Sequence, residues 1–197
     1  MPRKEPATLT GYELLLCPTG GIACYKSADL ASKLVQAGAA VAVAMTEAAT
    51  RFVTPLTFQS LTGQQVYTSL WQATKVYEPH HVAVTERADL MIVAPATANI
   101  IAKFAGGIAD DLVSTLGLSA AGACEILIAP AMNARMWLAP ATGANMKTLT
   151  ERGVHVVGPG TGRLACGAAG PGRMAESDEI LAAATELLLK KPPKAKA

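Results

Sequence analysis

The chain has 197 residues, of which 51% are hydrophobic and 16% are charged, so it can bury one sizeable core and is too apolar to be intrinsically disordered. Without residues 1–5 and 190–197 it holds 11 basic and 14 acidic residues, so the net charge of +2 comes from the ends. The body is slightly acidic, which speaks against a nucleic-acid-binding surface, and no apolar run approaches the roughly 20 residues that span a bilayer.

Alanine and glycine dominate the composition. The chain has 38 Ala and 17 Gly, whereas aromatic residues make up 5%. We therefore expect a core of small side chains and closely packed backbone, which gains less apolar area per residue than an aromatic-rich core. A bound ligand or contacts between subunits would then supply part of the stability.

The N-terminus and the cysteines predict a cytoplasmic protein. The first basic residues are not followed by an apolar segment of the kind that a secretory signal needs. The four cysteines, at positions 17, 24, 124 and 166, form neither a CxxC pair nor a zinc-binding spacing. Free thiols in a reducing compartment, and no bound metal, are the expectation.

Short apolar runs alternate with segments of helical spacing along the chain. Residues 12–17 predict a first strand, which ends in a Pro-Thr-Gly-Gly turn, and apolar residues then recur at helical spacing as far as Gly38. Further strands are predicted at residues 41–45, 90–94, 126–129 and 154–157. Further helices are predicted around residues 108–119, at 141–151, and at 177–189 with Ser177 as the N-cap.

Continuously apolar strands that alternate with helices are typical of a parallel sheet covered on both faces. The pattern predicts a three-layer, doubly wound α/β fold of the Rossmann-like or flavodoxin-like kind. We expect one domain over residues 1–197, with its core at about 11–189 and a flexible Lys/Pro tail at 190–197. In such sheets ligands bind beyond the carboxyl ends of the strands, which directs attention to the loops there.

The first of these loops places Gly20 and Gly21 where a strand meets a helix. Backbone N–H groups and the helix N-terminus can bind an anion at such a place, although a turn with positive φ explains the glycines equally well. The spacing is not the GxGxxG of dinucleotide-binding folds. Thr46, Ala48 and Ala49 end the second strand and suit a phosphate or ribityl chain, but a threonine there is as often a helix N-cap.

The third and fourth strand ends are also rich in small residues. Residues 95–99 would let a flat ring approach the backbone, and Thr97 and Asn99 offer hydrogen bonds. Farther on, Asp110 or Asp111 suits the N-cap of the next helix. Asn133, in the segment Pro-Ala-Met-Asn after the fourth strand, has an amide that can both donate and accept a hydrogen bond.

The segment after the last strand holds six glycines between Gly158 and Gly172 around Cys166. A loop of this kind can act as a mobile flap, and a thiol near its middle favours a catalytic or redox role over a structural one. His155 begins a strand and is expected to be structural. His80 and His81 precede the third strand; spacing alone favours a solvated surface pair, with a general base as the alternative.

Five segments together resemble the flavin-dependent cysteine decarboxylases. They are GGIACYK, HVAVTERAD, APATANIIAKFAGG, PAMNARMW and LACGAAGPGRM, which begin at residues 20, 81, 94, 130 and 164. The resemblance extends over residues 12 to about 180. Each motif alone is common, and the order of all five makes the resemblance specific.

The resemblance implies an FMN enzyme that acts on a small molecule and assembles as a trimer or as a dodecamer of trimers. Most closely it implies decarboxylation of 4′-phosphopantothenoylcysteine to 4′-phosphopantetheine and CO2 in coenzyme A biosynthesis. The cysteine moiety is oxidised to a thioaldehyde, loses CO2 and is reduced again, so the net reaction is redox-neutral.

The same resemblance assigns roles to single residues. It implies His81 as the base, Asn133 as the amide that binds the substrate carboxylate, and Cys166 as the proton donor of the reductive half. Contacts to FMN are implied for Gly20, Gly21, Ile22, Thr46, Ala48, Ala49, Thr97, Ala98, Asn99, Ile100 and Ala165. Candidates for the substrate phosphate are Lys26, Arg163 and Arg173.

Two other functions stay open beside this one. A decarboxylase of the C-terminal cysteine of a peptide would release the oxidised aminoenethiol and would not need Cys166. A phosphatase-binding regulatory flavoprotein would need no catalysis, and the joint presence of His81, Asn133 and Cys166 makes it the less favoured class.

Overall fold

The computed structural model describes residues 9–71, 80–163, 167 and 169–195, and of residues 80–82 it describes the backbone alone. The strands are β1 (Glu13–Cys17), β2 (Ala40–Ala44), β3 (Val66–Tyr67), β4 (Leu90–Ala96), β5 (Glu125–Pro130), β6 (His155–Val156), β7 (Gly160–Arg163) and β8 (Ala169–Arg173). The helices are α1 (Cys24–Gln36), α2 (Glu47–Thr50), α3 (Pro55–Thr62), α4 (His80–Arg87), α5 (Ala98–Gly106), α6 (Leu112–Ala120), α7 (Ala134–Trp137), α8 (Pro140–Glu151) and α9 (Ser177–Leu188).

Six parallel strands form the central sheet in the order β3-β2-β1-β4-β5-β6. This confirms the predicted doubly wound parallel sheet. The order places β1 beside β4, with Leu14 opposite Leu90, although β2 and β3 lie between them in the chain. The connections run outward in both directions from this pair, so the carboxyl ends of β1 and β4 form the topological switch point where such folds bind ligands.

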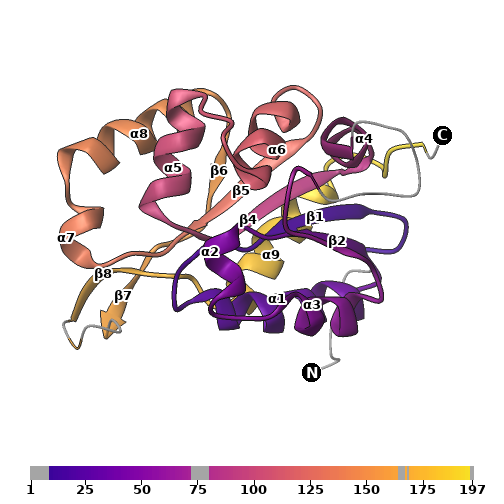
Figure 1. Ribbon diagram of the computed structural model, residues 1–197, viewed down its shortest axis with the longest axis horizontal. Helices are drawn as coiled ribbons and strands as arrows, with labels where there is room; N and C mark the ends of the chain where they lie inside the picture. Colours follow the sequence, from indigo (N-terminus) through magenta and orange to yellow (C-terminus); the bar gives the residue numbers. More distant parts are fainter. Residues whose placement is uncertain (1–8, 72–79, 164–166, 168, 196–197) are drawn as a thin grey trace.

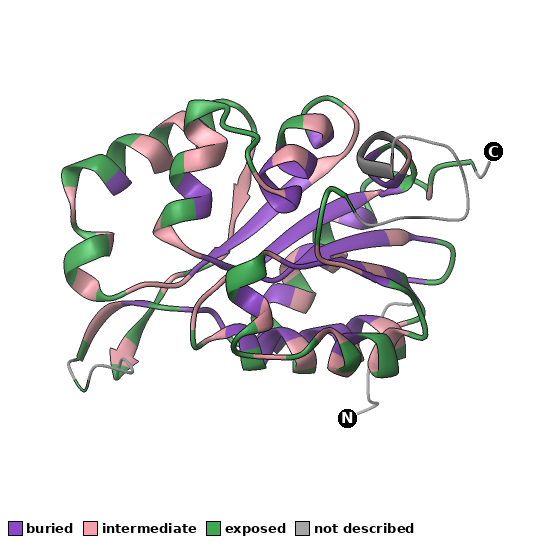
Figure 2. Cartoon of the chain, viewed as in Figure 1, coloured by how far each residue is buried: buried purple, intermediate pink, exposed green. Residues whose placement is uncertain are grey.

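Helices cover both faces of the sheet (Figure 1). Helices α1, α3 and α9 pack on one face, and α4, α5, α6 and α8 pack on the other. The strands are the buried layer, and the helices expose their outer sides (Figure 2). The largest fully buried side chains are Phe58 and a set of Leu, Ile and Met residues, which agrees with the expectation of an aromatic-poor core.

Two capping predictions have different outcomes. Asp111 is the N-cap of α6 and accepts a hydrogen bond from the Ser114 N–H at 2.9 Å, as one of the predicted alternatives required. Ser177 is not the N-cap of α9, because Glu176 and Glu179 form a reciprocal capping box and Ser177 Oγ donates to the Lys26 carbonyl at 3.2 Å. The prediction for Ser177 was therefore wrong, because the Glu176 and Glu179 carboxylates cap this helix in place of a serine hydroxyl.

The glycine-rich segment after β6 contains a two-stranded antiparallel hairpin, β7–β8, which is separate from the main sheet. The sequence analysis did not predict these strands. The hairpin lies beside α7 at the carboxyl edge of the sheet (Figure 1). It thus stands next to the strand-end loops that carry the predicted site.

The Lys/Pro segment at the C-terminus is exposed but hydrogen-bonded over the residues that the structure describes. Tyr12 Oη donates to the Lys191 carbonyl at 2.7 Å. Lys194 Nζ donates to the carbonyls of Glu86, Ala88 and Ala123 at 2.7–2.8 Å. Among residues 9–71, 80–163 and 169–195, no helix is long and apolar enough to cross a membrane.

Candidate functional site

A cleft of about 1400 Å³ lies beyond the carboxyl ends of the strands. Its walls come from the loops after β1, β2, β4 and β5 and from the β7–β8 hairpin. The predicted site residues that line it are Gly20, Gly21, Ile22, Thr46, Ala48, Thr97, Ala98, Asn99, Ile100 and Asn133. The structure thus brings together residues from four separate strand ends.

Gly20 is required by close packing and not by backbone conformation. Its φ and that of Gly21 lie outside the positive range, so the positive-φ explanation of this pair was wrong. A Cβ at Gly20 would overlap the Ala48 methyl group and crowd the Ala48 backbone. The loops after β1 and β2 are therefore in direct contact, and the backbone of the first loop is open to the cleft.

Thr19 ties the first loop to the end of β4. Its side chain is 1% exposed, and Oγ1 donates to the Pro95 carbonyl at 2.5 Å and accepts from the Thr97 N–H at 3.3 Å. One helical turn into α1, Ser27 Oγ donates to the Ala94 carbonyl at 2.5 Å. These bonds join the first loop and the start of α1 to the end of β4, and so hold together the floor of the cleft.

Three predicted ligand residues are also helix N-caps. Thr46 Oγ1 accepts from the Ala49 N–H at 3.2 Å, and Thr97 Oγ1 accepts from the Ile100 N–H at 3.4 Å. Asn133 Oδ1 accepts from the Met136 N–H at 2.8 Å. The N-cap alternative for Thr46 is therefore confirmed, and each cap points the positive end of its helix at the cleft.

The bond to the Met136 N–H sets the orientation of the Asn133 amide. With Oδ1 held by its own helix, Nδ2 is left as a donor. Asn133 is exposed and lines the cleft. An N–H2 group at the start of a helix is suited to bind an anionic group such as a carboxylate.

Most cationic side chains of the cleft already have acidic partners. Lys26 Nζ lies 2.9 Å from Glu176 Oε1, and Arg173 Nη2 lies 2.6 Å from the same oxygen. Lys103 Nζ lies 2.6 Å from Asp110 and 2.5 Å from Asp111. The Lys103 ammonium lowers the pKa of Asp110, and the two aspartates raise the pKa of Lys103.

The remaining two cations of the cleft are less constrained. Arg51 Nη2 lies 3.7 Å from Glu47, and both side chains are largely exposed. Arg163 lines the cleft from β7, and within the described part of the chain it has no salt-bridge partner. These two arginines are the cations with the most capacity to bind a substrate anion.

The base of the hairpin is fixed to the loop after β5. The Met132 N–H donates to the Gly172 carbonyl at 2.9 Å. Gly172 has φ of +120°, and a Cβ there would overlap the Met132 carbonyl oxygen. The sequence identifies Gly172 only as one of six glycines in this segment. Which of the six packs against another loop depends on the fold and leaves no local pattern in the sequence.

Three predicted residues are not tested by the structure, and a fourth, Ala49, does not line the cleft. Ala165 and Cys166 lie outside the described residues. His81 is in the first turn of α4, and the structure describes only its backbone. Ala49 lies behind the wall of the cleft, because its side chain is fully buried in the core and only its N–H reaches Thr46.

The cysteines that the structure describes form no disulfide with one another and belong to no cluster of metal-ligating side chains. Cys17, Cys24 and Cys124 are free thiols, and burial raises the pKa of Cys24 to about 11. Over the described ranges, no group of three His, Cys, Asp or Glu side chains is placed to hold a metal ion.

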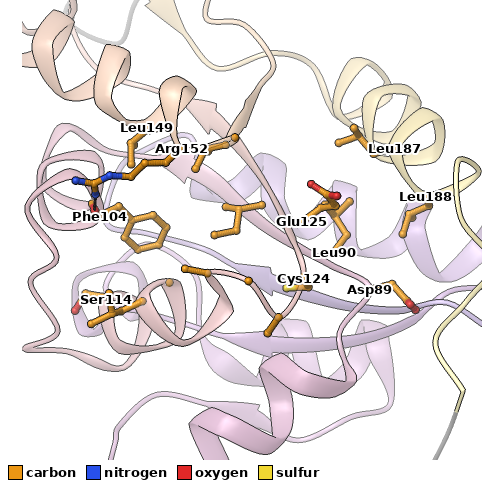
Figure 3. Close-up of a pocket in the computed structure, with 18 of the residues that line it drawn as sticks. Asp89, Leu90, Phe104, Ser114, Cys124, Glu125, Leu149, Arg152, Leu187 and Leu188 are labelled. Atoms are coloured by element: carbon orange, nitrogen blue, oxygen red, sulfur yellow. Dashed lines mark hydrogen bonds between the residues drawn. The ribbon is translucent and has the colours of Figure 1, made fainter.

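A second cavity, of about 450 Å³, lies toward the amino ends of β4 and β5 (Figure 3). Its labelled lining includes the apolar side chains of Phe104 and Leu149. The charged groups there have partners: Arg152 Nη1 donates to the Ala105 carbonyl at 2.9 Å, and Glu125 lies 3.1 Å from both His155 and Lys191. The large cleft is therefore the candidate functional site.

Comparisons with known proteins identify the family of the chain. A family model described as Flavoprotein matches residues 2–189. The chain is 48% identical over 173 residues to the coenzyme A biosynthesis bifunctional protein CoaBC of Bacillus subtilis. That match covers 88% of this chain and 42% of the relative, so the chain spans less than half the length of this relative.

Two solved structures have the same fold. One is a cysteine-to-serine mutant of a PPC decarboxylase complexed with pantothenoylaminoethenethiol, with a TM-score of 0.79, 27% identity and coverage of 91% of this chain and 99% of that one. The other is the FMN-dependent cysteine decarboxylase SpaF, with a TM-score of 0.77, 29% identity and coverage of 91% and 98%.

Proposed function

Because the chain belongs to the flavoprotein family, we propose that it binds FMN in the cleft and decarboxylates 4′-phosphopantothenoylcysteine to 4′-phosphopantetheine and CO2 in coenzyme A biosynthesis. The 48% identity over 88% of the chain to a protein named for coenzyme A biosynthesis carries this proposal. The cysteine-to-serine PPC decarboxylase structure, complexed with an ethenethiol, supports it.

The residues of the cleft fit FMN. Gly20 packs against Ala48 with no room for a side chain, so backbone N–H groups and small side chains line this part of the cleft. A flat ring can approach such a wall, and the capped N-termini of α2 and α5 favour a phosphate nearby. When bound, FMN supplies a reversible two-electron oxidation of the cysteine moiety.

The substrate chemistry explains why a redox cofactor serves a net non-redox reaction. Oxidation of the CH2–SH carbon to a thioaldehyde removes two electrons and two protons. The C–C bond to the carboxylate then breaks, and its electron pair passes into the thiocarbonyl, which becomes an enethiolate. Uptake of one proton converts the enethiolate to the enethiol, and return of two electrons and two protons gives the saturated thiol, so overall a proton replaces the carboxylate and CO2 is lost.

Three side chains of this chain have proposed roles. Asn133 donates from Nδ2 to the substrate carboxylate and holds it at the start of α7, because Oδ1 is already bound to the Met136 N–H. His81 acts as the base in the oxidative half. Cys166, which stands between β7 and β8 in the sequence, donates a proton in the reductive half.

The proposal extends to assembly and compartment. Ile22, Tyr25, Phe52 and Met136 line the cleft and are 45–61% exposed, which supports a homotrimer, or a dodecamer of trimers, in which another subunit covers the rim. Light scattering of the purified chain measures the mass of the assembly, which tests this oligomeric state. The free thiols of Cys17, Cys24 and Cys124 support a reducing, cytoplasmic compartment.

The test is incubation of the purified, FMN-loaded chain with 4′-phosphopantothenoylcysteine, followed by mass spectrometry. The expected product has lost CO2 and retains the saturated thiol. A peptide ending in cysteine, tested in parallel, identifies the peptidyl alternative if it alone is decarboxylated. A colourless protein that cannot be reconstituted with FMN would refute the cofactor assignment.

A further inference from the structure

Lys26 is a buried lysine that the proposed chemistry does not use. It is 8% exposed and lies in the first turn of α1, just after the loop that carries Gly20 and Gly21. A buried ammonium group is costly unless it is paired and hydrogen-bonded. The hydrogen-bond partners of Lys26 therefore indicate the role of its side chain.

Both partners of the Lys26 ammonium lie just after the hairpin. Nζ donates to the Met174 carbonyl at 3.3 Å and to Glu176 Oε1 at 2.9 Å. Met174 directly follows β8, and Glu176 is the N-cap of α9. Lys26 thus joins the glycine loop side of the cleft to the base of the hairpin.

Two further bonds close this connection. Arg173, the last residue of β8, donates from Nη2 to Glu176 Oε1 at 2.6 Å, so one carboxylate oxygen serves two cations. The hydroxyl of Ser177 donates to the Lys26 carbonyl at 3.2 Å. The Lys26 ammonium lowers the pKa of Glu176, which keeps that carboxylate charged at neutral pH.

The hairpin base is therefore held from two sides. On one side the Met132 N–H donates to the Gly172 carbonyl at 2.9 Å, and on the other side Lys26 bonds to Met174 and Glu176. Both sides line the cleft, since Lys26, Met132 and Gly172 are among its wall residues. Together with the contacts between β8 and α7, these two attachments join the hairpin to the body of the protein.

We propose that Lys26 is a positioning residue that sets the hairpin β7–β8 relative to the cleft through Met174, Glu176 and Arg173. The inference rests on the proposed function, because its consequence for catalysis depends on the role of Cys166. A loosened hairpin should impair the reductive half, for which Cys166 supplies a proton, more than the oxidative half. Lys26 is then not a ligand of the substrate phosphate, since its ammonium is already occupied.

The first test measures hydrogen exchange in the full-length, FMN-loaded protein. Lys26→Met removes the charge and keeps most of the apolar stem. We expect the amides of β7 and β8 to exchange roughly tenfold faster, while those of β1 and β4 are unchanged. Lys33→Met is the matched control, because Lys33 also joins α1 to the start of α9, through Asp178 at 2.8 Å, without contacting the hairpin.

The second test measures which product leaves the enzyme in a single turnover with enzyme in excess. In Lys26→Met, we expect a larger fraction of the product to leave as the enethiol, and the two electrons removed from the substrate then stay on the cofactor. The rate of CO2 release should stay within about twofold of that of the wild type. Glu176→Gln should also increase the fraction of enethiol. Its amide oxygen can still cap α9, but the negative charge that pairs with Lys26 is gone. Lys26→Arg should restore part of the normal product, and the Lys26→Met/Glu176→Gln pair should be non-additive.

Unchanged exchange in the hairpin of both Lys26→Met and Glu176→Gln would overturn the proposal. Faster exchange across the whole sheet would also overturn it, because Lys26 would then serve stability alone. A raised KM with unchanged exchange would assign Lys26 to the substrate phosphate instead. If the wild-type chain fails to decarboxylate the substrate, the proposed function fails, and the exchange measurement still decides the role of Lys26.

Discussion

The Asn133 side chain combines a structural and a binding role in one amide. Its oxygen caps α7 and its nitrogen remains free to donate to a ligand. The sequence analysis identified the residue, but could not assign the two ends of the amide, because that assignment depends on the Met136 N–H. Substitutions that remove one end at a time can separate the two roles.

Asn133→Asp keeps an oxygen to cap α7 and replaces the Nδ2 donor with a negative charge. We expect kcat/KM to fall by roughly 100-fold or more, because the substrate carboxylate meets a like charge, while the thermal midpoint stays the same or rises. Asn133→Ala should also lose activity and in addition cost about 1 kcal/mol of stability. Steady-state kinetics and thermal unfolding check both variants. Normal kinetics in Asn133→Asp would disprove the carboxylate contact.

A glycine is needed at position 20 because Ala48 packs against it and leaves no space for a side chain. Gly20→Ala should destabilise the fold by about 1–3 kcal/mol and weaken FMN binding, because the new methyl group overlaps Ala48. Adding Ala48→Gly should recover part of both losses. Gly143→Ala is the control, since nothing lies near its Cβ in the exposed interior of α8, and it should stabilise by about 0.5–1 kcal/mol. Denaturant titration and flavin fluorescence measure the effects, and a neutral Gly20→Ala would contradict the close packing.

At the scale of elements, apolar runs were sufficient to predict the buried strands. Strands β1, β2, β4 and β5 have continuous apolar sequences because helices cover both of their faces. The hairpin was missed for the opposite reason: Gly160–Arg163 and Ala169–Arg173 are mostly glycine, proline and arginine, with little intrinsic strand preference. These strands exist because they pair with each other and contact the loop after β5, and neither contact leaves a local pattern.

The C-terminal segment gives an element-scale prediction. Lys194 donates to the Glu86 and Ala88 carbonyls at the end of α4, where a positive charge is favourable, and also to the Ala123 carbonyl. Lys194→Met should therefore cost about 1 kcal/mol of stability, since one partly buried and two exposed hydrogen bonds lose their donor.

Lys190→Met is the matched control for this change. Lys190 contacts only the exposed Glu186, at 3.4 Å, among the salt-bridge partners that the structure describes. An exposed pair of this kind contributes little, so the control should change the unfolding free energy by less than about 0.5 kcal/mol. Equal effects of the two substitutions, measured by urea unfolding, would mean that residues 190–195 behave as a solvated tail.

For the whole molecule, ion pairs make stability depend on pH in a definite direction. The pKa values of Asp110, Glu125 and Glu176 are lowered by Lys103, Lys191 and Lys26 respectively. A carboxyl group whose pKa is lowered in the folded protein stabilises the fold at any pH above its ordinary pKa, which is 3.8 for Asp and 4.5 for Glu. This stabilisation is lost as the pH falls through the pKa of the folded protein. The unfolding free energy should therefore decline below about pH 4.5.

A double variant tests this assignment. Asp110→Asn with Glu125→Gln should be less stable than the wild type at pH 7, and its stability should decline less steeply below pH 4.5. The two curves should converge in acid, because the wild type has then lost the same charges. Urea unfolding at a series of pH values provides the comparison. Parallel curves would show that other groups cause the acid sensitivity.

The neighbouring positions of β1 and β4 have a consequence for how the chain folds. The bond from Thr19 to the Pro95 carbonyl joins residues 76 positions apart, so the floor of the cleft cannot form until the chain is present as far as the end of β4. Contacts over such separations slow folding, because the intervening chain must lose its freedom before they form. During synthesis on the ribosome, the first glycine loop must wait for β4 to emerge. Quenching of flavin fluorescence would therefore report the completion of the fold and not an early intermediate.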